Sequence, residues 1–224
     1  MGPIPSLLVI TDRHAAARGG HTVSEAAERA VAGGAPAVLL RDKDLPVEQR
    51  RALGEQLRPI VAAAGARLLI STDVALARHL DADGVHLAAD DPSCPEAVGM
   101  VGRSCHDADE VAAARAEGVA YASVSPVAAT ASKPGHGPAL GVAGLEQLVA
   151  VADGLPLLAL GGVTPANLAA WRHAGAHGIA VMGRVMAAAD PAESVRVLLA
   201  AWDNAGGAAD TAGIPQPSQE ASPP

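Results

Sequence analysis

Short runs of branched apolar residues recur along the chain, and each is followed by an alanine-rich segment with the apolar spacing of a helix. Strands that alternate with helices favour parallel pairing in one sheet. The predicted strands are 7–11, 37–41, 67–71, 84–87, 101–104, 121–125, 157–160 and 179–182. The predicted helices are 22–32, 47–63, 74–80, 107–116, 142–151, 165–174 and 191–202, with 92–99 read as a short helix or a loop.

Eight strand–helix units in about 200 residues predict a closed barrel, so the fold class is α/β with a single TIM (β/α)8 barrel. We expect the barrel to occupy residues 1–203. The segment 204–224 is rich in Gly, Ser, Ala and Pro, which is typical of a disordered tail.

Turn-forming residues agree with this division of the chain. Glycines stand where the predicted helices end, which suits the backbone conformation of a helix C-terminus. Asp107 and Thr164 stand where helices are predicted to begin, and both side chains can accept a hydrogen bond from a first turn. Pro165 would then occupy the first helical position, where its missing N–H has no cost.

Composition narrows the classes of function. Half of the residues are apolar but there is no Phe, so the core must consist of Ala, Val, Leu and Ile. The net charge is −8 and no basic run reaches four residues, which argues against a nucleic-acid partner. We found no signal peptide and no apolar run of the roughly 18 residues that a membrane helix needs, so we expect a cytoplasmic protein.

The ends of several predicted strands carry side chains that could act together at the mouth of a barrel. Arg41 and Lys43 follow the second strand and share one face of the extended chain, so both could hold one anion. Asp90 and Asp91 follow the fourth strand and offer carboxylate oxygens to Mg²⁺. The alternative for the first pair is a solvated loop, and for the second pair a helix cap.

Two further strand ends carry polar residues. Ser104 and His106 share a face after the fifth strand, where a histidine could move a proton and a serine could hold a phosphate or hydroxyl. Cys105 between them is more readily explained by packing than by nucleophilic chemistry. A long loop around Lys133 follows the sixth strand, and its small and hydroxylated residues could wrap a phosphate or could simply be a flexible surface loop.

Glycines follow the seventh and eighth strands, at Gly161, Gly162 and Gly183. Glycine lets a backbone approach a ligand closely. The loops at these two places are the recurrent phosphate site of the barrel fold. These glycines indicate a phosphorylated ligand without specifying which one.

The sequence resembles the thiamine phosphate synthase and TenI superfamily from residue 7 to residue 202. The motifs that carry the resemblance are ITD at 10–12, LRDK at 40–43, ADGVHLAADD at 82–91, GRSCH at 102–106, SPVAATASKPG at 125–135, LALGGVTPAN at 158–167 and GIAVMGRVM at 178–186. The resemblance implies a synthase that joins hydroxymethylpyrimidine pyrophosphate to thiazole phosphate with release of pyrophosphate. It also implies that Mg²⁺ and nearby cations stabilise the leaving group.

The resemblance further implies roles for individual residues. The groups near the pyrophosphate would be Arg41, Lys43, Ser104 and Lys133, with Ser104, His106 and Lys133 as the catalytic candidates. Those near the thiazole phosphate would be Thr130, Ser132, Gly161, Gly162, Met182 and Gly183. Asp91 matches a Mg²⁺ ligand, and Asp73 is the candidate for the second.

The chain departs from the synthase pattern on one side of this site. Leu39 stands where the synthases usually have Gln, and Ala88-Ala89 stand where they have Gly-Gln. Thr72 occupies the position of a Mg²⁺-binding Asp, unless a shift of one residue brings Asp73 there. The glycines of the predicted phosphate site match the synthase pattern more fully than the residues of the predicted metal and pyrimidine sites do.

These departures leave three hypotheses open. The first is an active Mg²⁺-dependent synthase. The second is a metal-independent thiazole tautomerase, although the proton-transfer His of such enzymes would stand at Pro126 here, which leaves His106 as the candidate. The third is a barrel that binds thiazole phosphate without turnover. In each case the partner is a small phosphorylated molecule, and the sequence leaves an oligomer open.

Overall fold

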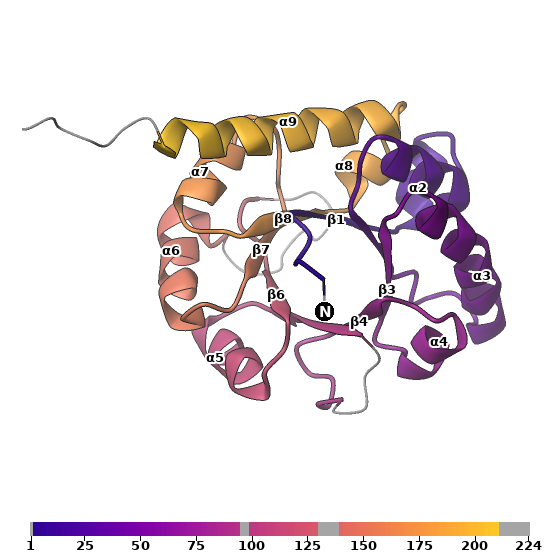
Figure 1. The fold of residues 1–224 in the computed structure, drawn as a ribbon, viewed down its shortest axis with the longest axis horizontal. Helices are drawn as coiled ribbons and strands as arrows, with labels where there is room; N and C mark the ends of the chain where they lie inside the picture. The colour runs from indigo at the N-terminus through magenta and orange to yellow at the C-terminus, as the bar shows by residue number, and fades with distance from the viewer. Residues whose placement is uncertain (1, 95–98, 130–138, 211–224) are drawn as a thin grey trace, which may run out of the picture.

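The computed structural model describes residues 2–94, 99–129 and 139–210. Within these residues, eight parallel strands pair in sequence order, and β8 pairs with β1 to close a barrel (Figure 1). The strands are β1 Leu7–Ile10, β2 Ala37–Leu40, β3 Arg67–Ser71, β4 Gly84–Leu87, β5 Met100–Cys105, β6 Tyr121–Val124, β7 Leu157–Leu160 and β8 Gly178–Val181. The predicted fold class is confirmed, and the strand bounds agree with the prediction to within one residue.

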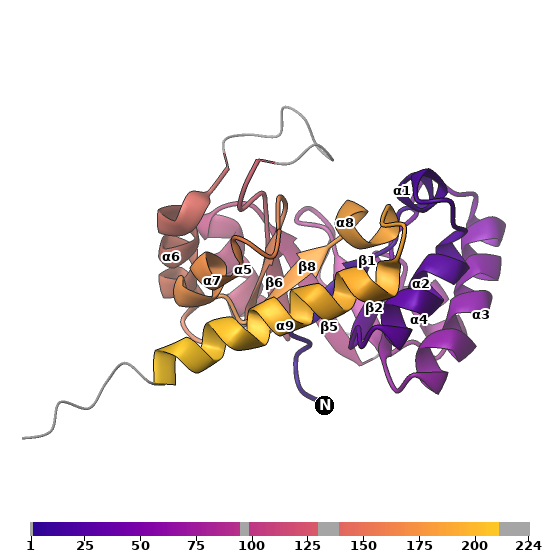
Figure 2. The same ribbon diagram turned by 90° about the horizontal axis from the view of Figure 1, so that it is seen from above.

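Helices lie around most of the barrel in Figure 1, with none among the described residues between β4 and β5. They are α1 Arg13–Arg18, α2 Val23–Ala32, α3 Val47–Ala63, α4 Val74–His79, α5 Ala108–Glu117, α6 Gly141–Ala152, α7 Leu168–His173, α8 Gly183–Met186 and α9 Pro191–Asp210. Figure 2 shows α1 and α8 at the end of the barrel opposite the N-terminus, where the strands end. None of the helices in the described part of the chain is long and apolar enough to cross a membrane.

Alternate residues along each strand face two different apolar regions. One cluster includes Val9, Val38, Ile70 and Val85 with the apolar faces of the helices, so it is the layer between sheet and helices. The other fills the inside of the barrel. The residues of the interior cluster are Leu8, Ile10, Ala37, Leu39, Leu69, Met100, Tyr121, Leu158 and Ala180. Most of the core consists of the predicted Ala, Val, Leu and Ile, but it also contains Met100, Tyr121, Trp171, Met186 and Trp202.

Several helix boundaries differ from the prediction for local reasons. Asp107 is the N-cap of α5 as expected, and its side chain accepts from Glu110 N. Thr164 and Pro165 do not begin α7, because residues 165–167 form a turn in which Asn167 Oδ1 accepts from Thr164 N. The short helices α1 and α8 were not predicted. Helix α9 continues to Asp210, so the expected boundary between 203 and 204 falls inside a helix, while 211–224 lie outside the described residues.

Glycine at position 102 allows the tyrosine to cross the barrel interior. Gly102 of β5 pairs with Tyr121 of β6. A Cβ at Gly102 would lie 2.2 Å from Tyr121 Cζ and 2.5 Å from its hydroxyl. Since real Cβ atoms do not approach other atoms this closely, any larger residue at 102 must displace the ring.

We therefore expect Gly102→Ala to lower the free energy of unfolding by about 1–3 kcal/mol, the usual effect of overpacking a core. Gly144→Ala in α6 is the matched control, because its Cβ meets only Leu140 side-chain atoms, at 3.1 Å or more, and a helix interior favours Ala over Gly. Urea unfolding of both variants measures the difference. Equal stabilities would show that Tyr121 does not need the space at 102.

Candidate active site

The inward-facing residues at the strand ends divide the mouth of the barrel into two sides. Polar side chains come from β3 to β6, and the apolar side chains Ile10, Leu160 and Met182 come from β1, β7 and the end of β8. The polar side chains are Ser71, His86, Ser104 and Ser123. Because parallel strands end at one rim, this arrangement follows directly from the barrel register.

His86 is the centre of a buried hydrogen-bond network on the polar side. Its Nδ1 lies 2.9 Å from the Tyr121 hydroxyl. Its Nε2 lies 3.0 Å from Ser104 Oγ and 3.3 Å from Ser123 Oγ. Four side chains from three neighbouring strands, β4, β5 and β6, are thereby held in one geometry.

Burial keeps this histidine neutral. Desolvation, with smaller contributions from the positive charges of Lys43 and Arg103, lowers the pKa of His86 to about 3. Burial also raises the pKa of Tyr121, so its phenol keeps its proton. Within the described residues the phenol proton has a partner only if it donates to His86 Nδ1, which assigns the ring proton to Nε2. His86 Nε2 then donates to Ser104 Oγ, and the Ser104 hydroxyl proton is free to face the mouth.

A second buried network fixes the end of β2. Asp42 is 4% exposed, and its carboxylate accepts from Thr11 Oγ1 at 2.6 Å and from Arg13 N at 2.7 Å. Arg41 N in turn donates to Thr11 Oγ1 at 2.9 Å. Neither Thr11 nor Asp42 was predicted as a site residue, although they lie within the motifs ITD and LRDK. Together they tie the segment that carries Arg41 and Lys43 to the end of β1.

The predicted cation pair lies on the mouth side of this network. Arg41 and Lys43 follow the inward-facing Leu39 at intervals of two residues, and the buried Asp42 stands between them in the sequence. Arg41 is half-buried and Lys43 is exposed. The positive charge of Lys43 is one of the causes that lower the pKa of His86.

The Asp91 carboxylate lies in a tight turn after β4. Its Oδ2 accepts from Ala88 N at 2.7 Å, and Arg103 donates to the carbonyls of both Ala88 and Asp91 at 2.8 Å. Asp91 is half-buried, while Asp90 is exposed. The turn leaves Asp91 near the rim with one carboxylate oxygen engaged.

Asp73, predicted as a second metal ligand, has a structural role at the start of α4. It is the N-cap of α4, where Oδ1 accepts from Leu76 N at 2.8 Å. Its Oδ2 pairs with Arg50 at 2.6 Å. Thr72, with φ of 61°, turns the chain from β3 into this cap. Because both carboxylate oxygens are engaged, the geometry does not support Asp73 as a Mg²⁺ ligand.

Ser104 and His106 lie in different surroundings although they share a strand face. Ser104 is part of the His86 network, as described above. His106 is exposed, and its Nδ1 lies 2.9 Å from Glu110 Oε2 on α5. Cys105 is fully buried, and burial raises the pKa of its thiol to about 12, in agreement with a packing role. The network position favours Ser104 over His106 as a group that meets a ligand.

The glycines of the predicted phosphate site lie where the backbone must turn sharply. Gly161 and Gly162 have φ of 95° and 64°, and a Cβ at Gly162 would lie 2.6 Å from Ala129 O. Asn167 donates to Gly162 O at 2.9 Å and so holds this turn. Met182 and Gly183 lie at the start of α8. The loops after β6 and β7 pack directly on each other at this point. Position 162 therefore has room only for glycine.

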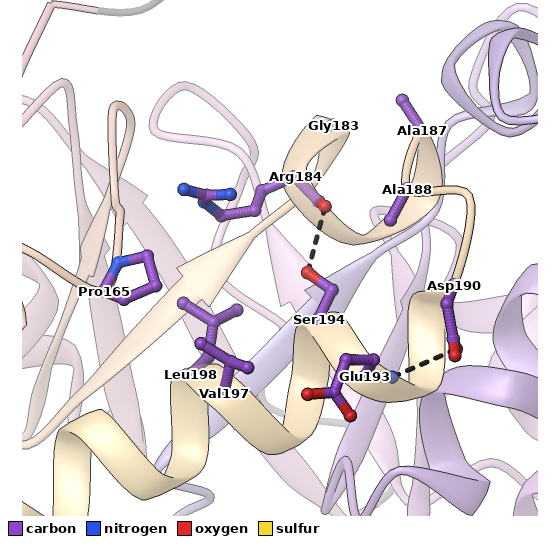
Figure 3. Close-up of a pocket in the computed structure, with 10 residues that line it drawn as sticks. All are labelled: Pro165, Gly183, Arg184, Ala187, Ala188, Asp190, Glu193, Ser194, Val197 and Leu198. Atoms are coloured by element: carbon purple, nitrogen blue, oxygen red, sulfur yellow. Dashed lines mark hydrogen bonds between the residues drawn. The ribbon is translucent and has the colours of Figure 1, made fainter.

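A cavity of about 480 Å³ lies between α8, α9 and the loop after β7 (Figure 3). Gly183, Arg184 and Pro165 line it, together with the acidic Asp190 and Glu193. None of the polar strand-end residues inside the barrel lines this cavity. The mixed charge and the position on the outer side of α8 argue against it as the place where the barrel-mouth residues act.

Three predicted residues, Thr130, Ser132 and Lys133, lie outside the described residues. Their assignment therefore stays a prediction.

Comparison with known proteins connects this geometry to a family. The family model for thiamine monophosphate synthase matches residues 7–185. The chain belongs to the thiamine monophosphate synthase family. The resemblance noted from the motifs is confirmed.

Individual relatives cover nearly the whole folded chain. The chain is 39% identical over 206 residues to the thiamine-phosphate synthase of Roseiflexus castenholzii, covering 88% of this chain and 89% of that protein. It is 38% identical to that of Methanoculleus marisnigri over 198 residues, covering 86% and 92%. A solved structure of thiamine phosphate pyrophosphorylase from Pyrococcus furiosus matches with a TM-score of 0.78 and 28% identity, covering 89% of this chain and 96% of that one.

The buried histidine predicts a distinctive pH dependence in this family member. The unfolded chain binds a proton at His86 near pH 6.5, but the folded chain does not until about pH 3. The unfolded state therefore gains protons first as the pH falls, and stability is lost between pH 6.5 and 3 at up to about 1.4 kcal/mol per pH unit. We expect His86→Gln to remove this part of the acid sensitivity.

Urea unfolding between pH 7 and 4 measures the effect. The control is His79→Gln, which removes an exposed histidine that pairs with Glu55. Parallel curves for wild type and His86→Gln would show that His86 is not held neutral.

The structural role of Asp73 gives a second expectation. Asp73→Ala loses the α4 cap and should lower the free energy of unfolding by about 0.5–2 kcal/mol. Asp73→Asn keeps a capping side chain and should retain most of that stability. In activity assays of the Asn variant we expect the Mg²⁺ concentration for half-maximal rate to stay within twofold of wild type. A tenfold increase in that Mg²⁺ concentration would instead support Asp73 as a metal ligand.

Proposed function

We propose that this chain is a thiamine phosphate synthase, a transferase that joins hydroxymethylpyrimidine pyrophosphate to thiazole phosphate. The observation that carries the proposal is the set of polar strand-end residues on one side of the mouth, in a chain that belongs to this family over residues 7–185. Its relatives named thiamine-phosphate synthase share up to 39% identity with it. The ligands are small phosphorylated molecules.

The reaction breaks the bond between the pyrimidine methylene carbon and a pyrophosphate oxygen, which leaves with the electron pair. The thiazole nitrogen then supplies a lone pair to the carbon and forms the new C–N bond. Negative charge builds on the leaving group, so cationic and hydrogen-bonding groups that meet it there accelerate the step. The candidates are Arg41, Lys43 and the Ser104 hydroxyl, with Lys133 as a further prediction.

The His86 network prepares Ser104 for this role. Because His86 Nε2–H donates to Ser104 Oγ, the serine proton is available for an anionic oxygen. His86 itself stays neutral and adds no charge that would compete with the cations. The apolar side, with the half-buried Leu160 and Met182, offers surface to the heterocyclic rings.

The donor set fits Mg²⁺ in one specific way. Within the described residues there is no group of three or more Asp, Glu, His or Cys side chains that could hold a metal ion by themselves. Mg²⁺ is commonly held by one or two carboxylates together with substrate phosphates. Asp91 meets that requirement, and Mg²⁺ bound there would offset the charge on the leaving pyrophosphate.

The other two hypotheses have less support. A tautomerase needs a group to move protons, and position 126 holds a proline. His106 is tied to Glu110 at the exposed end of β5. A barrel that binds without turnover would not need the hydrogen-bonded Ser104 or the tethered Arg41–Lys43 segment. The cytoplasmic location and the oligomeric state stay predictions from the sequence.

The direct test is pyrophosphate release from purified protein with both substrates and Mg²⁺. We expect Lys43→Met to lower kcat/KM for the pyrimidine substrate roughly 10- to 100-fold, since a charge-assisted hydrogen bond contributes about 1.5–3 kcal/mol. Arg196→Met, which removes an exposed cation from α9, is the control. No pyrophosphate release above background, beside an active reference synthase, would end the proposal.

A further inference from the structure

Arg103 is a buried cation on the outer face of β5. It is 6% exposed and pairs in the sheet register with Leu87 of β4 and Ala122 of β6. Its neighbours along the strand face, Val101 and Cys105, belong to the apolar layer outside the barrel. A charge in such a layer is costly unless its hydrogen bonds are satisfied.

One edge of the guanidinium is neutralised by Glu117, the last residue of α5. Arg103 Nε lies 2.8 Å from Glu117 Oε2, and Nη2 donates to Oε1 at 2.9 Å. The Nη2 hydrogen bond and the short Nε–Oε2 distance neutralise the charge of the guanidinium and hold it against the end of α5. The remaining nitrogen, Nη1, is therefore aimed in a defined direction.

Nη1 is directed at the turn that follows β4. It donates to the carbonyls of Ala88 and Asp91, both at 2.8 Å, and lies 3.3 Å from Ala89 O. Three carbonyl oxygens of one short turn thus converge on a single nitrogen. A fork of this kind can be supplied by arginine but not by lysine, whose single ammonium could not also hold both oxygens of Glu117.

The turn determines which oxygen of Asp91 is available. Asp91 Oδ2 accepts from Ala88 N at 2.7 Å, and Asp91 N donates to Ala88 O at 3.2 Å. Arg103 closes the same turn from its outer side. Among the contacts of the described residues, Asp91 Oδ1 takes no part in the turn, so it is the oxygen that can meet a cation.

We propose that Arg103, held by Glu117, is a positioning residue that shapes the turn 88–91 and so presents Asp91 Oδ1 to a divalent cation bound with a diphosphate. The proposal rests on the proposed function for the identity of the cation site. Arg103 does not touch the reacting atoms. Its effect is to fix the carboxylate before the cation arrives, which reduces the ordering that binding requires.

The test is a titration of Mn²⁺ by electron paramagnetic resonance, with inorganic pyrophosphate present and no turnover. We expect Arg103→Lys to weaken Mn²⁺ binding by roughly tenfold. In synthase assays the Mg²⁺ concentration for half-maximal rate should rise by a similar factor, while kcat at saturating Mg²⁺ stays within about twofold. Arg115→Lys is the matched control, because Arg115 lies on α5 with Glu117 but forms an exposed ion pair with Asp153.

A double variant, Arg103→Met with Glu117→Leu, removes both charges and avoids an unpaired carboxylate. We expect the same weakening of Mn²⁺ binding. A folded Arg103→Lys variant that binds Mn²⁺ as tightly as wild type would overturn the inference even if the enzyme is active. Wild-type protein that binds no Mn²⁺ with pyrophosphate would also overturn it. Binding that depends on Arg103 without pyrophosphate release would support the inference and count against the proposed function.

Discussion

Closure of the parallel ladder is the constraint on which the rest of this structure depends. Once β8 pairs with β1, all eight strand ends lie on one rim, and each strand presents alternate residues to the inside. Side chains that are far apart in the sequence, such as Lys43 and Ser104, then share one opening. The register also restricts residue size: Gly102 pairs with Tyr121, and a Cβ at position 102 would overlap the tyrosine ring.

The barrel handles polar groups differently on its two faces. Inside, His86 is kept neutral, and its two ring nitrogens are satisfied by hydroxyl groups. Buried charges elsewhere are paired: Asp42 accepts from Thr11 and Arg13, and Arg103 on the outer face of β5 pairs with Glu117. The charged networks on the outer face hold the loops, and the neutral network on the inner face orients the serine at the mouth.

The strands could be predicted from the sequence because apolar runs and turn residues are local signals. Alternation along the chain also predicts that Arg41 and Lys43 share one face, and their joint contact with an anion stays a prediction. The sequence was insufficient for His86 and Tyr121, whose contact joins β4 to β6 and leaves no local pattern. A histidine and the single tyrosine of the chain, each at an inward position of a strand, were the only available hint.

Two helix-terminal features were not predicted from the sequence: the cap that Asp73 forms for α4, and the turn before α7. Asp73 has the residue type of a metal ligand, but an aspartate between a strand and a helix can equally be the N-cap of that helix. Its ion pair with Arg50 of α3 joins residues 23 positions apart, so no local pattern predicts it. The turn at 165–167 depends on the Asn167 side chain, which the Thr-Pro signal concealed. In both cases a side chain accepts a hydrogen bond from a backbone N–H: Asp73 from Leu76 N and Asn167 from Thr164 N. The sequence pattern alone did not predict these contacts.

We infer that a divalent cation, held with the pyrophosphate group, meets the protein at Asp91 and not at Asp73. The most direct measurement is a crystal structure with Mn²⁺ and pyrophosphate, in which anomalous scattering locates the metal. We expect the metal at about 2.1 Å from Asp91 Oδ1, a distance typical of such cations, with the Asp73–Arg50 pair intact. A metal coordinated by Asp73, or bound pyrophosphate with no metal at Asp91, would contradict the account.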